Sequence, residues 1–160
     1  MKSMQFAILA ICLASAASAA EKPSQAFLKK AIEGNFAEIQ IGQLAQQKGQ
    51  NEGVKKFGQM LSDDHAAANQ KAIDAAKSMG MTPPDGPRAD YEKMSKMSGA
   101  QFDRDFAMHM VADHQKDIAE YKKEANQADA AGEYAQGQLD TLQKHLETAK
   151  SLRSSKTSSR

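Results

Sequence analysis

Two short stretches of the sequence carry the side chains that transition metals prefer, and both have the same pattern, Phe-x3-apolar-x2-Asp-His. The second copy follows the first at an offset of 49 residues. Imidazole nitrogen and carboxylate oxygen together suit zinc, iron or manganese. A charged group or an imidazole beside an apolar seam is costly unless it has a partner, so both Asp-His pairs are candidate site residues. The copies consist of Phe57, Leu61, Asp64 and His65, and of Phe106, Met110, Asp113 and His114.

Four long segments must position these side chains. Apolar residues recur in them at three- and four-residue spacing, which predicts amphipathic helices over 24–49, 52–79, 98–126 and 129–152. Ser24 is expected to cap the first helix, Gly80 to end the second, and a capping box beginning at Ser98 to open the third. The composition agrees, because β-branched residues are few and tryptophan is absent.

The lengths of the connections predict how these helices pack. The first two helices are separated by only a few residues, as are the last two, so each pair should form an antiparallel hairpin. The connection over 80–97 is much longer and contains a short amphipathic piece around Tyr91. Two hairpins joined by one long crossover are typical of the ferritin-like topology. We therefore predict an all-α, ferritin-like four-helix bundle over residues 20–153, with a short helix in the crossover.

The heights of the polar residues bring a third helix into the candidate site. The midpoint of the first helix falls next to Glu38, that of the second at His65, and that of the third near Asp113. Groups at the midpoints of packed helices meet at one level, whichever way the helices run. We therefore expect a mid-bundle site for a divalent metal ion, zinc, iron or manganese. Its expected ligands are Glu38, Asp64, His65, Asp113 and His114.

The other two histidines, His145 and His109, are less favoured as ligands of this site. His145 lies more than a turn beyond the midpoint of the last predicted helix, whose central seam is filled by Leu139 and Leu142. It is therefore expected to be a cap or a residue at the edge of the surface. His109 has Asp105 and Asp113 one turn away on either side, which is typical of a surface pair.

A structural interpretation of the Asp-His pairs stays open. Pairing between residues of 52–79 and 98–126 would satisfy both partners without a metal. The protein would then be a non-enzymatic envelope stress or interaction module. Ferroxidase chemistry is disfavoured because no Glu-x-x-His motif occurs. A glycine-rich phosphate loop and a Gly-x-Ser-x-Gly elbow are also missing, so a binding or structural role is favoured over an enzyme.

Methionine provides a further alternative. Four methionines fall in or beside the crossover, and two more flank His109. Thioether and imidazole groups suit copper, especially Cu(I). Methionine at helical spacing is, however, a common core filler. The residues concerned are Met79, Met81, Met94, Met97, Met108 and Met110.

The N-terminus predicts export to the periplasm. Residues 1–19 read as a signal peptide, with Lys2, an apolar run and the cleavage motif Ala17-Ser18-Ala19. Cleavage would leave 160 minus 19, or 141 residues, with no cysteine and no apolar segment long enough to span a membrane. The polar tail over 154–160 is expected to be disordered.

The charge balance limits the partners. The chain has 21 basic and 20 acidic residues, and removal of Lys2 makes the numbers equal. This near-neutral balance argues against nucleic acid as a partner, because nucleic-acid binding needs a basic face. A partner protein in the envelope stays open, and no pattern indicates an oligomeric state.

Individual positions spread over about 24–152 also match a known family. They are Phe27, Ala31, Glu38, Ala45, Val54, Lys55, Phe57, Met60, Asp64, His65, Asn69, Gly99, Phe102, Asp103, Met110, Val111, His114, His145, Leu146 and Ala149. In these the chain resembles the bacterial family called domain of unknown function 4142, exported proteins placed in the ferritin-like superfamily. The resemblance implies a four-helix bundle of the periplasm or envelope and no established reaction. Gly58 stands where alanine is usual, which we expect to loosen its helix slightly.

Overall fold

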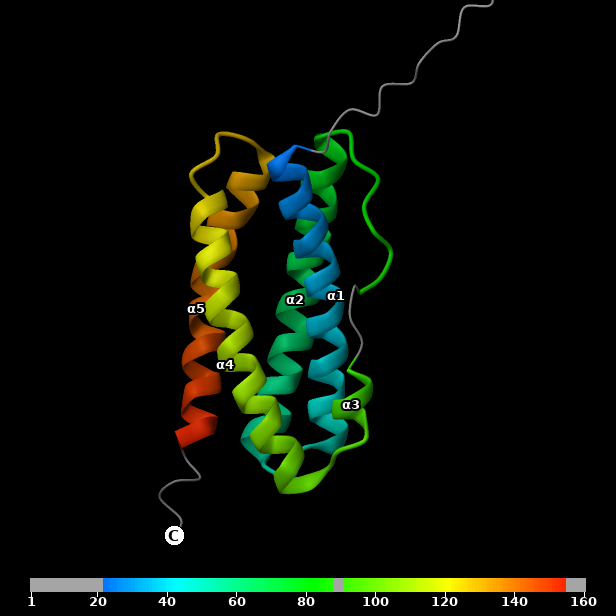
Figure 1. Cartoon of the computed structure of the whole chain (residues 1–160), viewed down its shortest axis with the longest axis vertical. Helices are drawn as coiled ribbons and strands as arrows, with labels where there is room; N and C mark the ends of the chain where they lie inside the picture. Colours follow the sequence, from blue (N-terminus) through cyan, green and yellow to red (C-terminus); the bar gives the residue numbers. More distant parts are fainter. Residues whose placement is uncertain (1–21, 88–90, 155–160) are drawn as a thin grey trace, which may run out of the picture.

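The computed structural model describes residues 22–87 and 91–154 as an all-helical chain (Figure 1). The predicted signal peptide and residues 155–160 of the predicted tail lie outside the described residues. Each long helix begins and ends within two residues of its predicted range, and the described part contains no strand. The helices are α1 (Pro23–Lys48), α2 (Glu52–Ser78), α3 (Glu92–Ser95), α4 (Gly99–Glu124) and α5 (Ala130–Ser154).

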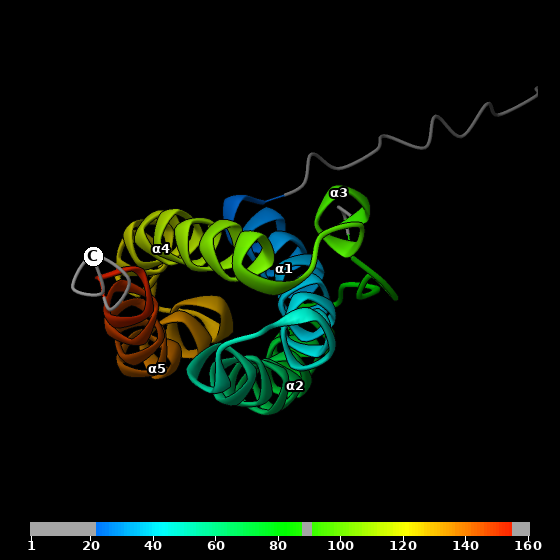
Figure 2. The same cartoon turned by 90° about the horizontal axis from the view of Figure 1, so that it is seen from below.

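The long helices form a four-helix bundle built from two hairpins. α1 packs against α2 and α4 against α5, and the hairpins meet through α2 with α5 and α1 with α4 (Figure 2). Residues 80–87 of the crossover lie on the outer side of α1 beyond the end of α2, and residues 91–98, which include α3, lie toward the opposite end of the bundle, where α4 begins (Figure 1). The predicted all-α bundle with a long crossover and a short helix is confirmed, and its topology is compatible with the ferritin-like superfamily. None of the described helices combines the length and the apolar composition needed to cross a bilayer.

The helix ends follow local rules, with two differences from expectation. Gly80, at a φ of 74°, donates its N–H to the carbonyl of Lys77 and ends α2 as predicted. α1 starts at Pro23 and not after a Ser24 cap, because proline presets the helical φ and has no N–H to satisfy. The predicted capping box of α4 is also wrong, since the side chain of Ser98 makes no capping hydrogen bond.

A buried carboxylate sets the height of α4 against the first hairpin. Asp103 accepts the backbone N–H of Gln50 at 3.0 Å and that of Asn51 at 3.1 Å. Both donors belong to the turn between α1 and α2, whose N–H groups have no partner within a helix. The first turn of α4 is thereby tied to the bottom of the α1–α2 hairpin.

Aromatic packing brings the two copies of the repeated pattern face to face. Phe57 of α2 and Phe106 of α4 meet edge to face, with ring centroids 5.8 Å apart. Phe102 stacks on Phe106 at 5.7 Å, and all three rings are buried. α2 and α4 run in the same direction (Figure 1), and each phenylalanine lies seven residues before the aspartate of its Asp-His pair. The contact between the rings therefore holds both pairs at the same level of the bundle.

α1 and α2 approach so closely that only glycine fits at their crossing. A Cβ atom on Gly58 would lie 2.5 Å from the backbone oxygen of Gly42, and one on Gly42 would lie 2.6 Å from the oxygen of Gly58. We expected Gly58 to weaken α2, but in the structure this glycine is needed for the packing of α2 against α1. The glycine allows a backbone-to-backbone contact that alanine would prevent.

Replacing Gly58 with alanine should destabilise the protein although alanine favours helices. The overpacked contact should cost about 1–3 kcal/mol, more than the roughly 0.5–1 kcal/mol that alanine gains in a helix. Urea denaturation would measure the change in unfolding free energy. Gly137→Ala is the matched control, because nothing lies within 4 Å of its Cβ position, and it should stabilise α5. A Gly58→Ala protein as stable as the unmodified chain would contradict the close contact.

Candidate metal centre

Three histidines from three helices meet in the core at the middle of the bundle. They are His65 of α2, His114 of α4 and His145 of α5, and all three are buried. One ring nitrogen of each lies within 4.8 Å of the corresponding nitrogens of the other two. We call this group the histidine triad.

Each ring of the triad is oriented by an acceptor on its other nitrogen. These acceptors are a side-chain amide, a backbone carbonyl and a carboxylate. An acceptor on one nitrogen holds the proton there and leaves the second nitrogen with a lone pair, and in His114 and His145 these second nitrogens face each other. The pairs are His65 Nδ1 with Asn35 Oδ1 at 2.9 Å, His114 Nδ1 with the Met110 carbonyl at 3.1 Å, and His145 Nε2 with Asp64 Oδ2 at 2.9 Å.

When neutral, the rings of His114 and His145 have only two protons for the three contacts that they make with Met110, with each other and with Asp64. His114 Nε2 and His145 Nδ1 lie 3.2 Å apart. Because His114 donates from Nδ1 to a carbonyl, its Nε2 can only accept when the ring is neutral. His145 could then donate from Nδ1 and to an ionised Asp64 together only as an imidazolium. Burial opposes that charge and lowers the pKa of His145, although the hydrogen bond that the ring donates to Asp64 acts in the other direction.

The other two rings are also held neutral. Burial lowers the pKa of the His65 ring well below its usual value, and the neighbouring histidines lower it further. Burial is also the main cause that lowers the pKa of His114 from 6.5 to about 4. Neutral imidazole is the form that binds a metal, so protons compete little for these rings at neutral pH.

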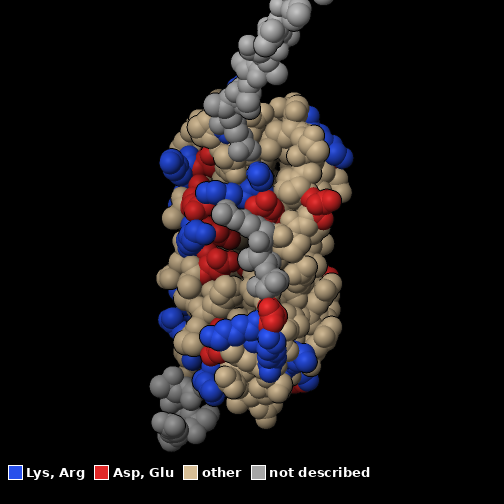
Figure 3. Space-filling view, turned by 45° about the vertical axis from the view of Figure 1, so that its right-hand side comes forward, with Lys and Arg blue, Asp and Glu red and all other residues tan. Residues whose placement is uncertain are grey.

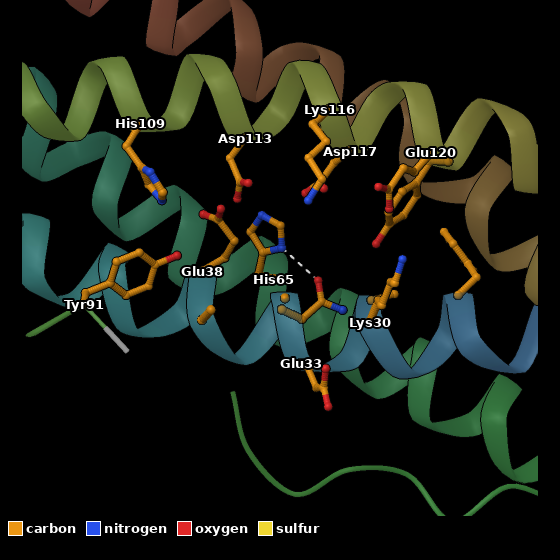
Figure 4. A pocket seen from close by; sticks show the side chains of 16 residues that line it. Lys30, Glu33, Glu38, His65, Tyr91, His109, Asp113, Lys116, Asp117 and Glu120 are labelled. Atoms are coloured by element: carbon orange, nitrogen blue, oxygen red, sulfur yellow. Dashed lines mark hydrogen bonds between the residues drawn. The ribbon is translucent and has the colours of Figure 1, made fainter. Parts of the chain in front are cut away.

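His65 connects the triad with a pocket on the face of the bundle. The pocket lies between α1 and α4, has a volume of about 490 Å³, and is bordered by the ring of His65 (Figure 4). His65 Nε2 is buried and has no hydrogen-bond partner among the described residues. Acidic side chains gather on this side of the molecule (Figure 3). Those that line the pocket are Glu33, Glu38, Asp113, Asp117 and Glu120.

The carboxyl groups of the pocket affect one another strongly. Burial, together with the charge of Asp113, raises the pKa of Glu38 well above its usual value. Burial and Asp113 also raise the pKa of Asp117 from 3.8 to about 7. Each of these acids would be more stable with a positive charge or a proton nearby.

The predicted ligands divide between the triad and the pocket. His65 and His114 lie together in the triad, while Glu38 and Asp113 point toward each other in the pocket (Figure 4). Asp64 pairs with His145 of α5, and not with the histidine of α4 that the structural interpretation assumed.

The expectations for the remaining two histidines are wrong. His145 is completely buried, and neither a cap nor at the surface. Its spacing carried the signal, since it lies three residues after Leu142 and four before Ala149, both on the buried side of α5. His109 is not a plain surface residue either, because it lines the pocket with its ring 5.5 Å from that of Tyr91.

The methionines do not gather in one place. Met79 and Met81 follow α2 at one end of the bundle, whereas Met94 and Met97 lie in and after α3 toward the other end (Figure 1). All four pack against the apolar core. Copper binding through these methionines stays a prediction, and their positions are those of core fillers.

The chain belongs to the family described as Domain of unknown function (DUF4142), whose model matches residues 12–152. The resemblance found in the sequence is thus confirmed. No curated protein and no solved structure matches the chain. The family brings no reaction or ligand with it, so a function has to be argued from the triad and the pocket.

Asp117→Asn should stabilise the protein more at pH 8 than at pH 5. The folded protein binds the Asp117 proton more tightly than the unfolded chain does, so its stabilising effect is present at low pH and is lost as the pH rises through about 7. Asparagine does not ionise, so the variant does not lose stability in this way. The difference in unfolding free energy between the variant and the unmodified protein should therefore favour the variant by about 2 kcal/mol more at pH 8 than at pH 5. Urea denaturation at both pH values would measure it, with the exposed Asp140→Asn as control. An advantage that is equal at both pH values would contradict the raised pKa.

Proposed function

We propose that this protein is an exported, non-enzymatic metal-binding bundle in which His65, His114 and His145 together bind one divalent transition-metal ion. The observation that carries the proposal is the meeting of three buried imidazole rings, each of which has one nitrogen engaged by an acceptor. Histidines that bind metals in proteins have this arrangement, with the far nitrogen donating to a carboxylate, a carbonyl or a similar group.

The distance between two of the three rings already suits a tetrahedral ion. Zinc binds imidazole nitrogen at about 2.0–2.1 Å, so two ligands in a tetrahedron lie about 3.3 Å apart. The 3.2 Å between His114 Nε2 and His145 Nδ1 is close to this value. His65 would move toward the other two rings on binding, and its free Nε2 would lose no hydrogen bond among the described residues.

The donor set favours zinc among the common ions. Three neutral imidazoles without a thiolate suit zinc and other borderline divalent ions, and magnesium or calcium would require oxygen ligands. Three protein ligands leave a fourth position of the tetrahedron for water or for another group.

A purely structural role of the triad accounts less well for the same contacts. With both rings neutral, His114 and His145 have two protons for three contacts, so one contact would lie between two acceptors unless a ring is charged. A structural role would also leave His65 Nε2 buried and without a partner in the part of the chain that the structure describes. A bound cation satisfies all three nitrogens together.

The proposed location is the periplasm. It is supported by the sequence features of residues 1–19, which are those of a signal peptide. Exported proteins meet an oxidising environment in which thiolate ligands are at risk. A site built from imidazole alone suits that compartment.

Zinc should raise the melting temperature of the chelator-treated protein. At a concentration 100 times the dissociation constant, binding adds about 2.7 kcal/mol, a shift of several degrees for a chain of this size. The His65→Ala/His114→Ala variant should lose the shift. His109→Ala, which removes a histidine outside the triad, should keep it. Equal shifts in the double variant, or no shift with zinc, manganese, iron or copper, would refute the metal site and leave the triad as a structural polar core.

The exported chain should begin at Ala20. Cleavage after Ala19 follows from the Ala17-Ser18-Ala19 motif, which places small residues where signal peptidase requires them. Intact-mass measurement of the protein from a periplasmic fraction tests this, and Ala19→Glu should leave the precursor uncleaved. Recovery of the full 160-residue chain from the cytoplasm would refute the proposed export.

A further inference from the structure

We infer that a second divalent cation, of the hard, oxygen-preferring kind represented by Mn²⁺ and Mg²⁺, binds in the pocket between α1 and α4, with Glu38 and Asp113 as its direct protein ligands. This site is separate from the histidine triad and goes beyond the proposed function. The two sites lie on either side of the His65 ring.

Glu38 is the observation that points to a ligand. Its side chain is only 2% exposed, and it comes from the middle of α1 toward the pocket. No N–H or O–H donor of the described residues reaches its carboxylate oxygens, and the polar group that faces them is the carboxyl of Asp113, with which Glu38 can form a hydrogen bond only when one of the two is protonated. Burial of a carboxylate without donors is costly, so a group that lies at these oxygens should carry positive charge or a proton.

Asp113 supplies a second carboxylate at the same place. Figure 4 shows Glu38 and Asp113 pointing toward each other from opposite helices, with Asp117 one turn farther along α4. Like charges this close repel each other unless a cation lies between them. A divalent ion bridging both groups would convert this repulsion into attraction.

The basic residues of the pocket form no ion pair with these acids, although the charge of Lys116 opposes the rise in the pKa of Asp117. Lys30 and Lys116 line the pocket, yet no ion pair joins either of them to Glu38, Asp113 or Asp117 in the described part of the chain. The charge needed at the two carboxylates therefore has to come from a proton or from a bound ion.

The size of the pocket indicates a hydrated ion. Its volume of about 490 Å³ is far larger than a bare cation, and water occupies about 30 Å³ per molecule in the liquid. Hard cations such as Mg²⁺ are commonly bound through one or two carboxylates while they keep several waters. Two carboxylates in a polar pocket with room for water match this kind of coordination. The oxygen donors also distinguish this site from the triad, whose donors are nitrogens.

Titration with Mn²⁺, used as the probe ion, tests directly whether the pocket binds a divalent cation. Zinc is added first to occupy the triad, Mn²⁺ is then titrated, and free Mn²⁺ is measured from its electron paramagnetic resonance signal. The full chain should bind one Mn²⁺, and millimolar Mg²⁺ should displace it. The Glu38→Gln/Asp113→Asn variant should lose at least tenfold in affinity. Glu133→Gln/Asp140→Asn, which removes the same charge from the exposed side of α5, should bind Mn²⁺ as the unmodified protein does.

The triad variant separates this inference from the proposed function. His114→Ala/His145→Ala, which disrupts the triad and leaves the pocket-lining His65 in place, should still bind one Mn²⁺ whether or not the triad binds zinc. The Glu38→Gln/Asp113→Asn protein should melt at or above the temperature of the unmodified chain in chelator, because two buried like charges are removed, so weaker binding cannot be ascribed to unfolding. The inference is overturned if the unmodified protein binds no Mn²⁺, if the carboxyl variant binds it equally well, or if the folded triad variant loses it.

Discussion

The burial of three imidazole rings at the middle of the bundle is the constraint on which the rest of the structure depends. An imidazole has two nitrogens, and a buried ring needs a partner for each of them. The bundle provides one partner per ring through an amide, a carbonyl and a carboxylate, and brings one nitrogen of each ring to within 4.8 Å of the others. One nitrogen of each ring thus has a hydrogen-bond partner, and the three rings together can offer nitrogen lone pairs to a metal ion.

Several features away from the triad hold the helices at the heights that this centre requires. Asp103 ties the start of α4 to the turn between α1 and α2. The glycine contact between α1 and α2 brings the backbones together, and the Phe57–Phe106 contact aligns α2 with α4. A slip of one residue along a helix is about 1.5 Å, which is enough to break a hydrogen bond in the triad.

The chemistry changes from nitrogen to oxygen across the ring of His65. On its inner side lie two further imidazoles, and on its outer side lies a pocket lined by carboxylates. Neutral nitrogen donors suit borderline ions such as zinc, whereas carboxylates and water suit hard cations. The same ring thus forms part of the proposed zinc site and a wall of the inferred second site.

The amino-acid sequence by itself determined the helices, the crossover and the mid-bundle level of the polar groups, because helical periodicity and connection length are local properties. It also indicated His65 and His114 through their repeated pattern. Only the tertiary structure decided that His145 completes the triad, that Asp64 pairs with it, and that Glu38 and Asp113 face a separate pocket. Those partners lie on different helices, and their meeting depends on the rotation and height of each helix in the bundle. Packing fixes the rotation and the height of each helix. Helix ends inferred from a sequence, by contrast, leave the height of a residue uncertain by roughly 3–6 Å.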